Sequence, residues 1–260
     1  MVFLIEIIDI NQENIHEKGF FCMRSKPKSQ GYQKKLAWLN ERFQEGLHLK
    51  IIEDNGHPKG FIEYIPSEYN WRGICGTNYM VIHCLWIVGK GKGKGYGSSL
   101  LNACLNHAKT LNKSGVAMVT SSETWLSDKS FFIKYGFKSV DIAPPCFELI
   151  VNSFDNHSIP HFNHGWEQRA EKYSQGITII RADQCPYFEE AVNLILEVAS
   201  EREIPSKVIH IENCKDAQNA PSAYGVFNIL LNGELLTYHP INKRELNKLL
   251  DNYESKRLNG

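Results

Sequence analysis

One segment constrains this chain more than any other: a loop in which glycine and lysine alternate. Residues 79–88 form a near-continuous apolar run, residues 89–98 read GKGKGKGYGS, and apolar residues then recur at helical spacing from Leu100 to Leu111. A helix start presents backbone N–H groups without internal partners, and glycine lets an anion approach them closely. The lysines add positive charge, so the segment predicts a binding loop for a ligand with several phosphates.

Two better-known phosphate loops do not match this segment. A P-loop requires a lysine directly before its serine or threonine, and here Ser98 follows Gly97. The dinucleotide fingerprint spaces its glycines as GxGxxG, whereas the glycines here alternate with single residues. A flexible basic hairpin is the other interpretation, and the strand before the loop and the helix after it count against it.

The loop resembles the central motif of the GNAT acetyltransferase superfamily, Gln/Arg-x-x-Gly-x-Gly/Ala, with Lys92 in the first position. In that family the loop amides hold the pyrophosphate of coenzyme A, and the preceding strand splays from its neighbour and pairs with the pantetheine arm. The resemblance therefore implies acetyl-CoA as co-substrate. It assigns the pantetheine to Leu85, Trp86, Ile87 and Val88, and the phosphates to Lys92, Gly93, Lys94, Gly95, Tyr96, Gly97 and Ser98.

A second motif supports this resemblance. The sequence FFIKYGF at residues 131–137 is similar to the family's Phe-Tyr-x-Lys-x-Gly-Phe, which ends a helix and begins a strand. Both motifs fall in residues 1–152, for which we expect an α/β (α+β) domain with the mixed, twisted GNAT sheet and flanking helices. The predicted strands are 4–10, 47–53, 60–65, 79–88, 116–120, 137–142 and 147–151, and the clearest helices are 32–43, 100–111 and 126–135.

Transfer in this family is direct attack of an amine on the acetyl thioester, so a base must accept the amine proton. His83 lies in the central strand, where family members often carry a glutamate, and Glu63 lies in the third strand. Both are candidate catalytic bases, the alternatives being a buried core histidine and a surface glutamate. The family's usual acid, a tyrosine, is replaced by Phe132, which leaves the thiolate to be protonated by solvent.

The connection before the central strand carries Tyr69-Asn70-Trp71-Arg72. An arginine beside aromatic rings can bind a carboxylate or stack on a ring. Trp71 and Arg72 are therefore candidate acceptor-binding residues, and a packed loop with an exposed arginine is the alternative. The expected acceptor is a primary amine of a small molecule or a peptide.

The composition shifts after the last of these strands. Residues 153–175 contain Asn, His, Pro and Gly with few aliphatic side chains, and indicate a linker or connecting arm. Residues 176–260 then predict a second domain in the order βαβ-ββα, with a hairpin turn at Asn232-Gly233. This order resembles a thioredoxin-like fold, and GNAT proteins with such a tail form the YoaP-like type, which the whole chain resembles.

Cys185 begins the sequence CPYF after the first strand of this domain, where glutaredoxins carry Cys-Pro-Tyr-Cys. A helix start lowers a thiol pKa, so Cys185 is a possible reactive thiol. Pro221 resembles the cis-proline that faces the thiol in that family. The resolving cysteine is replaced by Phe188, which argues against dithiol exchange. A packing role, a monothiol redox protein and a non-catalytic CoA-binding or thiol-sensing module remain as alternatives.

The overall composition excludes several classes of protein. The formal net charge is zero, which argues against a nucleic-acid partner held by bulk charge. No apolar run reaches about 18 residues, so no membrane span is expected. The seven cysteines show no zinc-ligand spacing, so no metal is expected, and they suit reduced thiols in a cytoplasmic protein. Nothing in the sequence indicates an oligomeric state.

Overall fold

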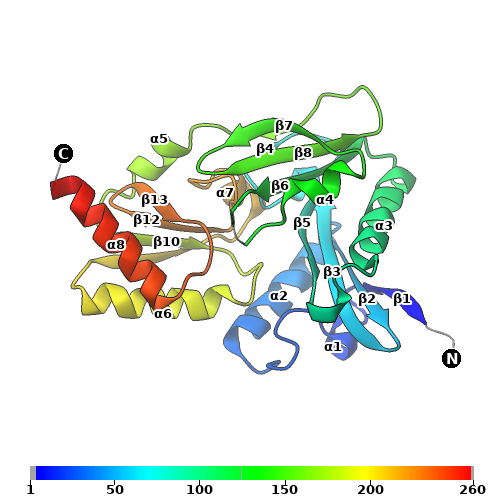
Figure 1. Cartoon of the computed structure of the whole chain (residues 1–260), viewed down its shortest axis with the longest axis horizontal. Helices are drawn as coiled ribbons and strands as arrows, with labels where there is room; N and C mark the ends of the chain where they lie inside the picture. Colours follow the sequence, from blue (N-terminus) through cyan, green and yellow to red (C-terminus); the bar gives the residue numbers. More distant parts are fainter. Residues whose placement is uncertain (1–3, 124, 259–260) are drawn as a thin grey trace.

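The computed structural model describes residues 4–123 and 125–258, and the N-terminal region of these residues is built on a seven-stranded sheet (Figure 1). The strand order is β1-β2-β3-β5-β6-β8-β7, and only β5 and β6 run parallel among the described neighbours. The sheet confirms the mixed topology expected from the sequence. Its strands are β1 (Ile5–Ile10), β2 (His48–Asp54), β3 (His57–Pro66), β5 (Tyr79–Ile87), β6 (Gly115–Ser121), β7 (Lys138–Ala143) and β8 (Phe147–Ser153).

Helices cover both faces of this sheet (Figure 1). Helix α3 (Tyr96–Thr110) provides the crossover between the parallel strands and packs Leu100 and Leu101 against one face. Helix α2 (Gln30–Gln44) packs Trp38 and Leu39 into the core of the other face. Two short helices, α1 (Ile15–Lys18) and α4 (Lys129–Ile133), and two 3-10 turns, η1 (Ser67–Tyr69) and η2 (Gly89–Gly91), complete this region.

The predicted helix 126–135 is wrong in its extent. Asp128 accepts a hydrogen bond from the backbone N–H of Ser130 and so caps a helix that begins only at Lys129. Trp125 has a positive φ of 83°, which is outside the helical region. The apolar residues of this segment therefore belong to a partly exposed loop that leads into one short turn of helix.

The C-terminal region, residues 176–258, forms a four-stranded sheet of order β11-β10-β12-β13 within the described residues. Strands β10 and β11 are parallel, and β12 and β13 form the antiparallel hairpin predicted around Asn232-Gly233. Helices α6 and α8 pack on each other through Lys243 and its partners Glu197 and Glu201. The elements are β10 (Ile177–Arg181), α6 (Phe188–Glu201), β11 (Ser206–His210), α7 (Cys214–Gln218), β12 (Phe227–Leu231), β13 (Glu234–Thr237) and α8 (Lys243–Leu258).

Residues 153–175, which the sequence predicted to be a linker or connecting arm, include regular secondary structure that packs on the rest of the chain. Strand β9 (His161–Phe162) pairs with β4 (Ile74–Cys75), which precedes the central strand. Helix α5 (Trp166–Glu171) buries Trp166. One expectation is wrong: the peptide bond before Pro221 is not cis, since the cis bond among the described residues joins Pro144 to Pro145.

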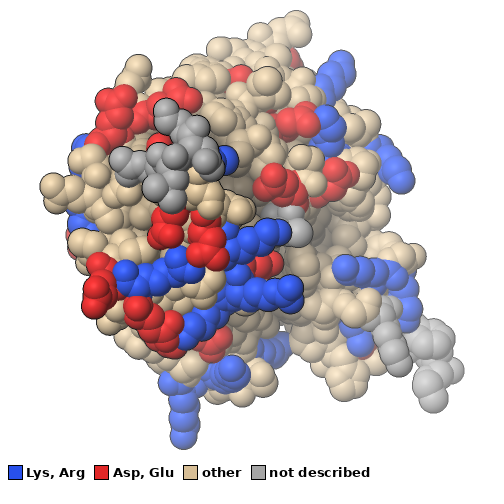
Figure 2. Space-filling model, turned by 60° about the vertical axis from the view of Figure 1, so that its left-hand side comes forward, with Lys and Arg blue, Asp and Glu red and all other residues tan. Residues whose placement is uncertain are grey.

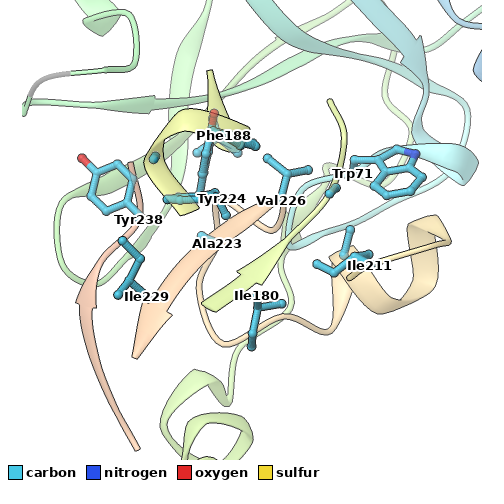
Figure 3. Packing of buried hydrophobic residues seen from close by; sticks show 14 of the residues in the cluster. Trp71, Ile180, Phe188, Ile211, Ala223, Tyr224, Val226, Ile229 and Tyr238 are labelled. Carbon is cyan, nitrogen blue, oxygen red and sulfur yellow. The ribbon is translucent and has the colours of Figure 1, made fainter. Parts of the chain in front are cut away.

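The two regions share one hydrophobic core. Trp71, from the loop before β5, belongs to the same cluster of buried side chains as Phe188 of α6 and Val226 beside β12 (Figure 3). Hydrogen bonds cross the same boundary, for example between the hydroxyls of Tyr238 and Ser121 at 3.0 Å. The C-terminal region therefore packs on the sheet as part of one body.

Surface charge is mixed on the face that Figure 2 presents, where basic and acidic side chains lie beside each other. Ion pairs at the surface of the described residues include Arg202 with Asp251 and Lys243 with Glu201. Such exposed pairs contribute little stability each. Within the described residues, no helix has the length and apolar character needed to span a bilayer.

Gly31 is one position where the two regions lie in close contact. It is the second residue of α2, and a Cβ at this position would collide with the carbonyl oxygen of Pro186, just before α6. Gly97 is the second residue of α3, and a Cβ there would meet Phe131 at 3.4 Å, an ordinary contact distance. The two glycines therefore differ in available space at the same helical position.

We expect Gly31→Ala to destabilise the protein by about 1–3 kcal/mol, because the backbone of Pro186 cannot move aside cheaply. Gly97→Ala should be neutral or stabilising, since alanine favours helix by up to about 1 kcal/mol over glycine. Urea unfolding of both variants measures the difference. Equal stability of the two would contradict the close contact between α2 and the chain before α6.

Candidate functional site

The backbone of the glycine–lysine loop is accessible to a ligand. Gly93 and Gly95 have φ values of 79° and 83°, which favour glycine, and a Cβ on either would meet nothing within 4 Å. Gly95 is the N-cap of α3, so the free N–H groups of that helix begin at this point. Lys92 and Lys94 are exposed beside it. This geometry suits a bound anion.

Side chains around the loop hold it in place. The Tyr96 hydroxyl donates to Asp54 Oδ2 at 2.6 Å, so this buried ring anchors the helix start to β2. The Tyr135 hydroxyl donates to Ser98, which ties α3 to the segment after α4. The Lys92 ammonium lies 5.6 Å from the centre of the Trp86 ring. Both tyrosines near the loop are thus engaged in positioning it.

The parallel strands β5 and β6 separate halfway along their length. They pair from Tyr79–Ile82 on one strand and Gly115–Met118 on the other, and the following residues of each strand are not paired with each other. Beyond the separation, β5 keeps its antiparallel pairing with β3. One edge of Leu85–Ile87 is therefore free to bind an extended ligand, except that the Leu85 carbonyl accepts a hydrogen bond from Ser127 at 3.3 Å.

A cavity of about 750 Å³ opens at this separation and extends between the two regions. Its walls include Leu85, Trp86 and Val88 of the β5 segment and Met118 of β6. Other side chains come from α2, from the loop around Trp125 and from the C-terminal region. The volume is in the range of small-molecule sites.

Glu63 lies at the wall of this cavity and is fully buried. Its carboxylate pairs with the Lys35 ammonium of α2, and its Oε1 accepts a hydrogen bond from Gln184 Nε2 at 2.8 Å. Burial by itself would raise the pKa of Glu63, but the Lys35 charge and the His83 contact outweigh it and hold the pKa at about 2. The carboxylate is therefore ionised at any physiological pH.

His83 occupies a bulge in β5, where the register against β3 shifts by one residue. Its Nε2 accepts a hydrogen bond from the Trp71 backbone N–H at 3.0 Å, so Nδ1 carries the ring hydrogen in the neutral form. Nδ1 lies 3.5 Å from Glu63 Oε1. Burial lowers the pKa of His83 to about 4 despite the contact with Glu63, so the ring is neutral at pH 7.

Arg72 lines the cavity but is almost completely buried. Its guanidinium donates to the carbonyls of Trp71 and His83 and to Gln184 Oε1, and lies 4.5 Å from the centre of the Tyr224 ring. Trp71 is also buried, packs edge-on against Trp38 and is not among the described residues that line the cavity. The exposed-arginine alternative is thus wrong, and Trp71 lies in the core.

Cys185 also faces the cavity, as do Cys22 and Cys84. Burial raises the pKa of Cys185 to about 11, although a hydrogen bond from the Tyr187 backbone acts to lower it. The expected activation at a helix start is therefore outweighed by burial. Phe188, at the position of a resolving cysteine, is buried and stacks on Phe227 with ring centres 4.4 Å apart.

Two residues of the site, Lys35 and Gln184, are missed by the sequence analysis. Lys35 lies three residues after Tyr32 and four before Leu39, on the apolar face of α2, and a lysine on such a face is a signal of a buried partner. Gln184 gives no comparable signal. It acts in the site only because the C-terminal region docks on the sheet, a contact between positions 121 residues apart.

Comparison with known proteins agrees with this geometry. Residues 13–137 match the model of the acetyltransferase (GNAT) family, which includes the loop, the separated strands and the FFIKYGF segment. This part of the chain is similar to GNAT acetyltransferase domains and is called the GNAT domain below. Residues 205–248 match the YoaP-like family, so the GNAT domain is joined to a YoaP-like region.

Individual proteins resemble the chain to different extents. An uncharacterized N-acetyltransferase, YoaP, from Bacillus subtilis is 28% identical over 249 residues, covering 94% of this chain and 98% of the relative. An L-methionine sulfoximine/L-methionine sulfone acetyltransferase from Salmonella typhimurium is 29% identical over 79 residues, covering 30% of this chain and 44% of the relative. The PaiA N-acetyltransferase structure from Thermoplasma acidophilum with coenzyme A is 16% identical, with a TM-score of 0.43, covering 58% and 99% of the two chains.

Proposed function

We propose that the chain is an N-acetyltransferase that moves the acetyl group of acetyl-CoA to a primary amine. The observation that carries this proposal is the separation of β5 and β6 beside an open anion loop, with a buried carboxylate and imidazole in the adjoining cavity. The names of both curated relatives support the same activity. The acceptor is a small molecule or a peptide with a free amine.

Acetyl-CoA is bound by the two elements on either side of η2. The N–H groups from Gly93 to Ser98 and the charges of Lys92 and Lys94 receive the phosphates. The free edge of the strand from Leu85 to Val88 pairs with the pantetheine amides, which requires the Ser127 hydroxyl to release the Leu85 carbonyl. The thioester then reaches the cavity at the point where the strands separate.

The amine nitrogen attacks the thioester carbonyl carbon, a C–N bond forms and the C–S bond breaks. The nitrogen loses its proton to Glu63, directly or through a water molecule, and the His83 ring beside it orients the carboxylate. Glu63 is an ionised acceptor above pH about 2, and attack makes the nitrogen far more acidic than the free ammonium, so a weak base suffices. The leaving thiolate takes a proton from solvent, because Phe132 is buried and has no acidic hydrogen.

The C-terminal domain, residues 176–260, is proposed to be thioredoxin-like. A parallel pair, β10 and β11, followed by an antiparallel hairpin, β12 and β13, supports this fold. The raised pKa of Cys185 and the packed Phe188 disfavour redox exchange. A CoA-binding module without transferase activity is distinguished by incubation with acetyl-CoA and a panel of amines: binding without release of free CoA would favour the module.

Gly95→Ala should weaken acetyl-CoA binding, because a methyl group would occupy the open space at the start of α3. We expect KM for acetyl-CoA to rise at least tenfold, measured by release of free CoA. Gly56→Ala is the matched control, since Gly56 also has a positive φ of 73° and open space around its Cβ, but lies in the turn between β2 and β3. Equal effects of the two variants would show that backbone strain, and not ligand contact, explains the loss.

His83→Ala should remove most turnover while leaving acetyl-CoA affinity intact, because the ring contacts Glu63 and not the anion loop. Steady-state kinetics and binding of acetyl-CoA by calorimetry measure the two effects separately. His83→Gln is a second variant that retains an acceptor for the Trp71 N–H, and it guards against a loss caused by unfolding. Unchanged turnover in both folded variants would eliminate His83 from the mechanism.

A further inference from the structure

The C-terminal region forms one whole wall of the cavity. Its contribution comes from the segment before α6, from Leu194 within that helix, and from Tyr224 and Ile241. The opposite wall is made by the GNAT domain, including Phe20, Phe61 and Trp86. Without the C-terminal region, the cavity beside Glu63 would lose this wall and keep only the sides formed by the sheet, by α2, by the segment before α2 and by the loop around Trp125.

Gln184 connects the two walls through both ends of its side-chain amide. Its Nε2 donates to Glu63 Oε1 at 2.8 Å, and its Oε1 accepts from Arg72 at 2.8 Å. The orientation of the amide is determined by these partners, because an ionised carboxylate only accepts and a guanidinium only donates. Gln184 is itself buried, so water does not compete for these bonds.

This arrangement controls the position of Glu63. The carboxylate has Lys35 on one oxygen, and Gln184 and the His83 ring on the other. Arg72 forms no ion pair among the described residues; its guanidinium donates to two backbone carbonyls and to Gln184 and lies over the Tyr224 ring. Loss of Gln184 would remove one buried hydrogen-bond partner from Arg72 and one from Glu63, which is costly.

The chemical character of the walls indicates the acceptor. The inner charges, Lys35, Glu63 and Arg72, already have protein partners, and Glu190 at the rim pairs with Lys26. The surface left for a ligand is mainly aromatic and aliphatic, with Phe20, Phe61, Trp86, Tyr187, Leu194 and Tyr224 among its members. Among the described residues that line the cavity, the carboxylates are Glu63, which the reacting amine needs, and Glu190, which is exposed, so an acceptor with further cationic groups has no second buried carboxylate to pair with.

We propose that the C-terminal region completes the acceptor pocket, that Gln184 is a positioning residue for Glu63, and that the acceptor is a small amine with an apolar body. This inference rests on the proposed acetyl transfer. In this proposal the YoaP-like region determines which acceptor fits the pocket, and Cys185 takes no part in the chemistry.

The test of Gln184 compares two variants of the full chain. Gln184→Leu should lower kcat at least tenfold with KM for acetyl-CoA within twofold of wild type. It should also move the acidic limb of the pH–rate profile to higher pH, because a hydrogen bond that favours the ionised Glu63 is lost and its pKa rises. Gln218→Leu is the control, since Gln218 donates across the same boundary to the Asn70 carbonyl at 3.0 Å but does not line the cavity.

Gln218→Leu should leave the pH profile unchanged even if it lowers stability. An unchanged profile and rate in Gln184→Leu, with wild type active, would overturn the positioning role. If wild type acetylates no amine at all, the proposed function fails first and this inference fails with it. The two failures are therefore distinguishable.

The acceptor class is tested with 2-phenylethylamine, spermidine and a lysine-containing hexapeptide. We expect kcat/KM for 2-phenylethylamine to exceed the others at least tenfold. Leu194→Trp, which fills the C-terminal wall, should lower that value at least tenfold while KM for acetyl-CoA is retained. Preference for spermidine or the peptide, or indifference to Leu194→Trp, would overturn the assignment.

Discussion

The structure depends on burying three charged side chains, Lys35, Glu63 and Arg72, at the boundary of its two regions. Such groups are costly to remove from water unless each finds hydrogen-bond partners. Lys35 and Arg72 come from the GNAT domain, but the bridge that satisfies Arg72 and Glu63 together is Gln184 of the C-terminal region. Breaking a buried network of this kind typically costs about 3–5 kcal/mol. The charges therefore couple docking of the second region to order in the site.

The bulge at His83 in strand β5 has several consequences for the site. It places the ring beside Glu63 and directs the His83 carbonyl to Arg72. After this point the strand leaves β6, which creates both the free edge at Leu85–Ile87 and the mouth of the cavity. The chain then turns through η2 into α3 and presents the open backbone of the glycine loop. A bound ligand would thus follow the strand from the loop toward the buried carboxylate.

Local signals in the sequence predicted most of the fold. The glycine loop, the Asn232-Gly233 hairpin and the apolar face of α2 each rest on near neighbours in the chain, and all three match the structure. The site was predicted only in part, because Gln184 and Glu63 meet across 121 residues and no local pattern encodes such a contact. The same reason explains Arg72, whose exposure was misjudged: the second region covers it. The raised pKa of Cys185 could not be predicted either, because the burial that raises it comes from the packing of the two regions.

A crystal structure of the full chain with coenzyme A and 2-phenylethylamine is the most direct test of the proposed site. We predict the pyrophosphate on the backbone from Gly93 to Ser98, the pantetheine along Leu85–Val88, and the amine nitrogen beside Glu63 and His83. The phenyl ring should contact Leu194 and Tyr224 of the C-terminal wall. An amine bound outside the cavity between the two regions, or coenzyme A bound away from the loop, would contradict the proposed binding mode.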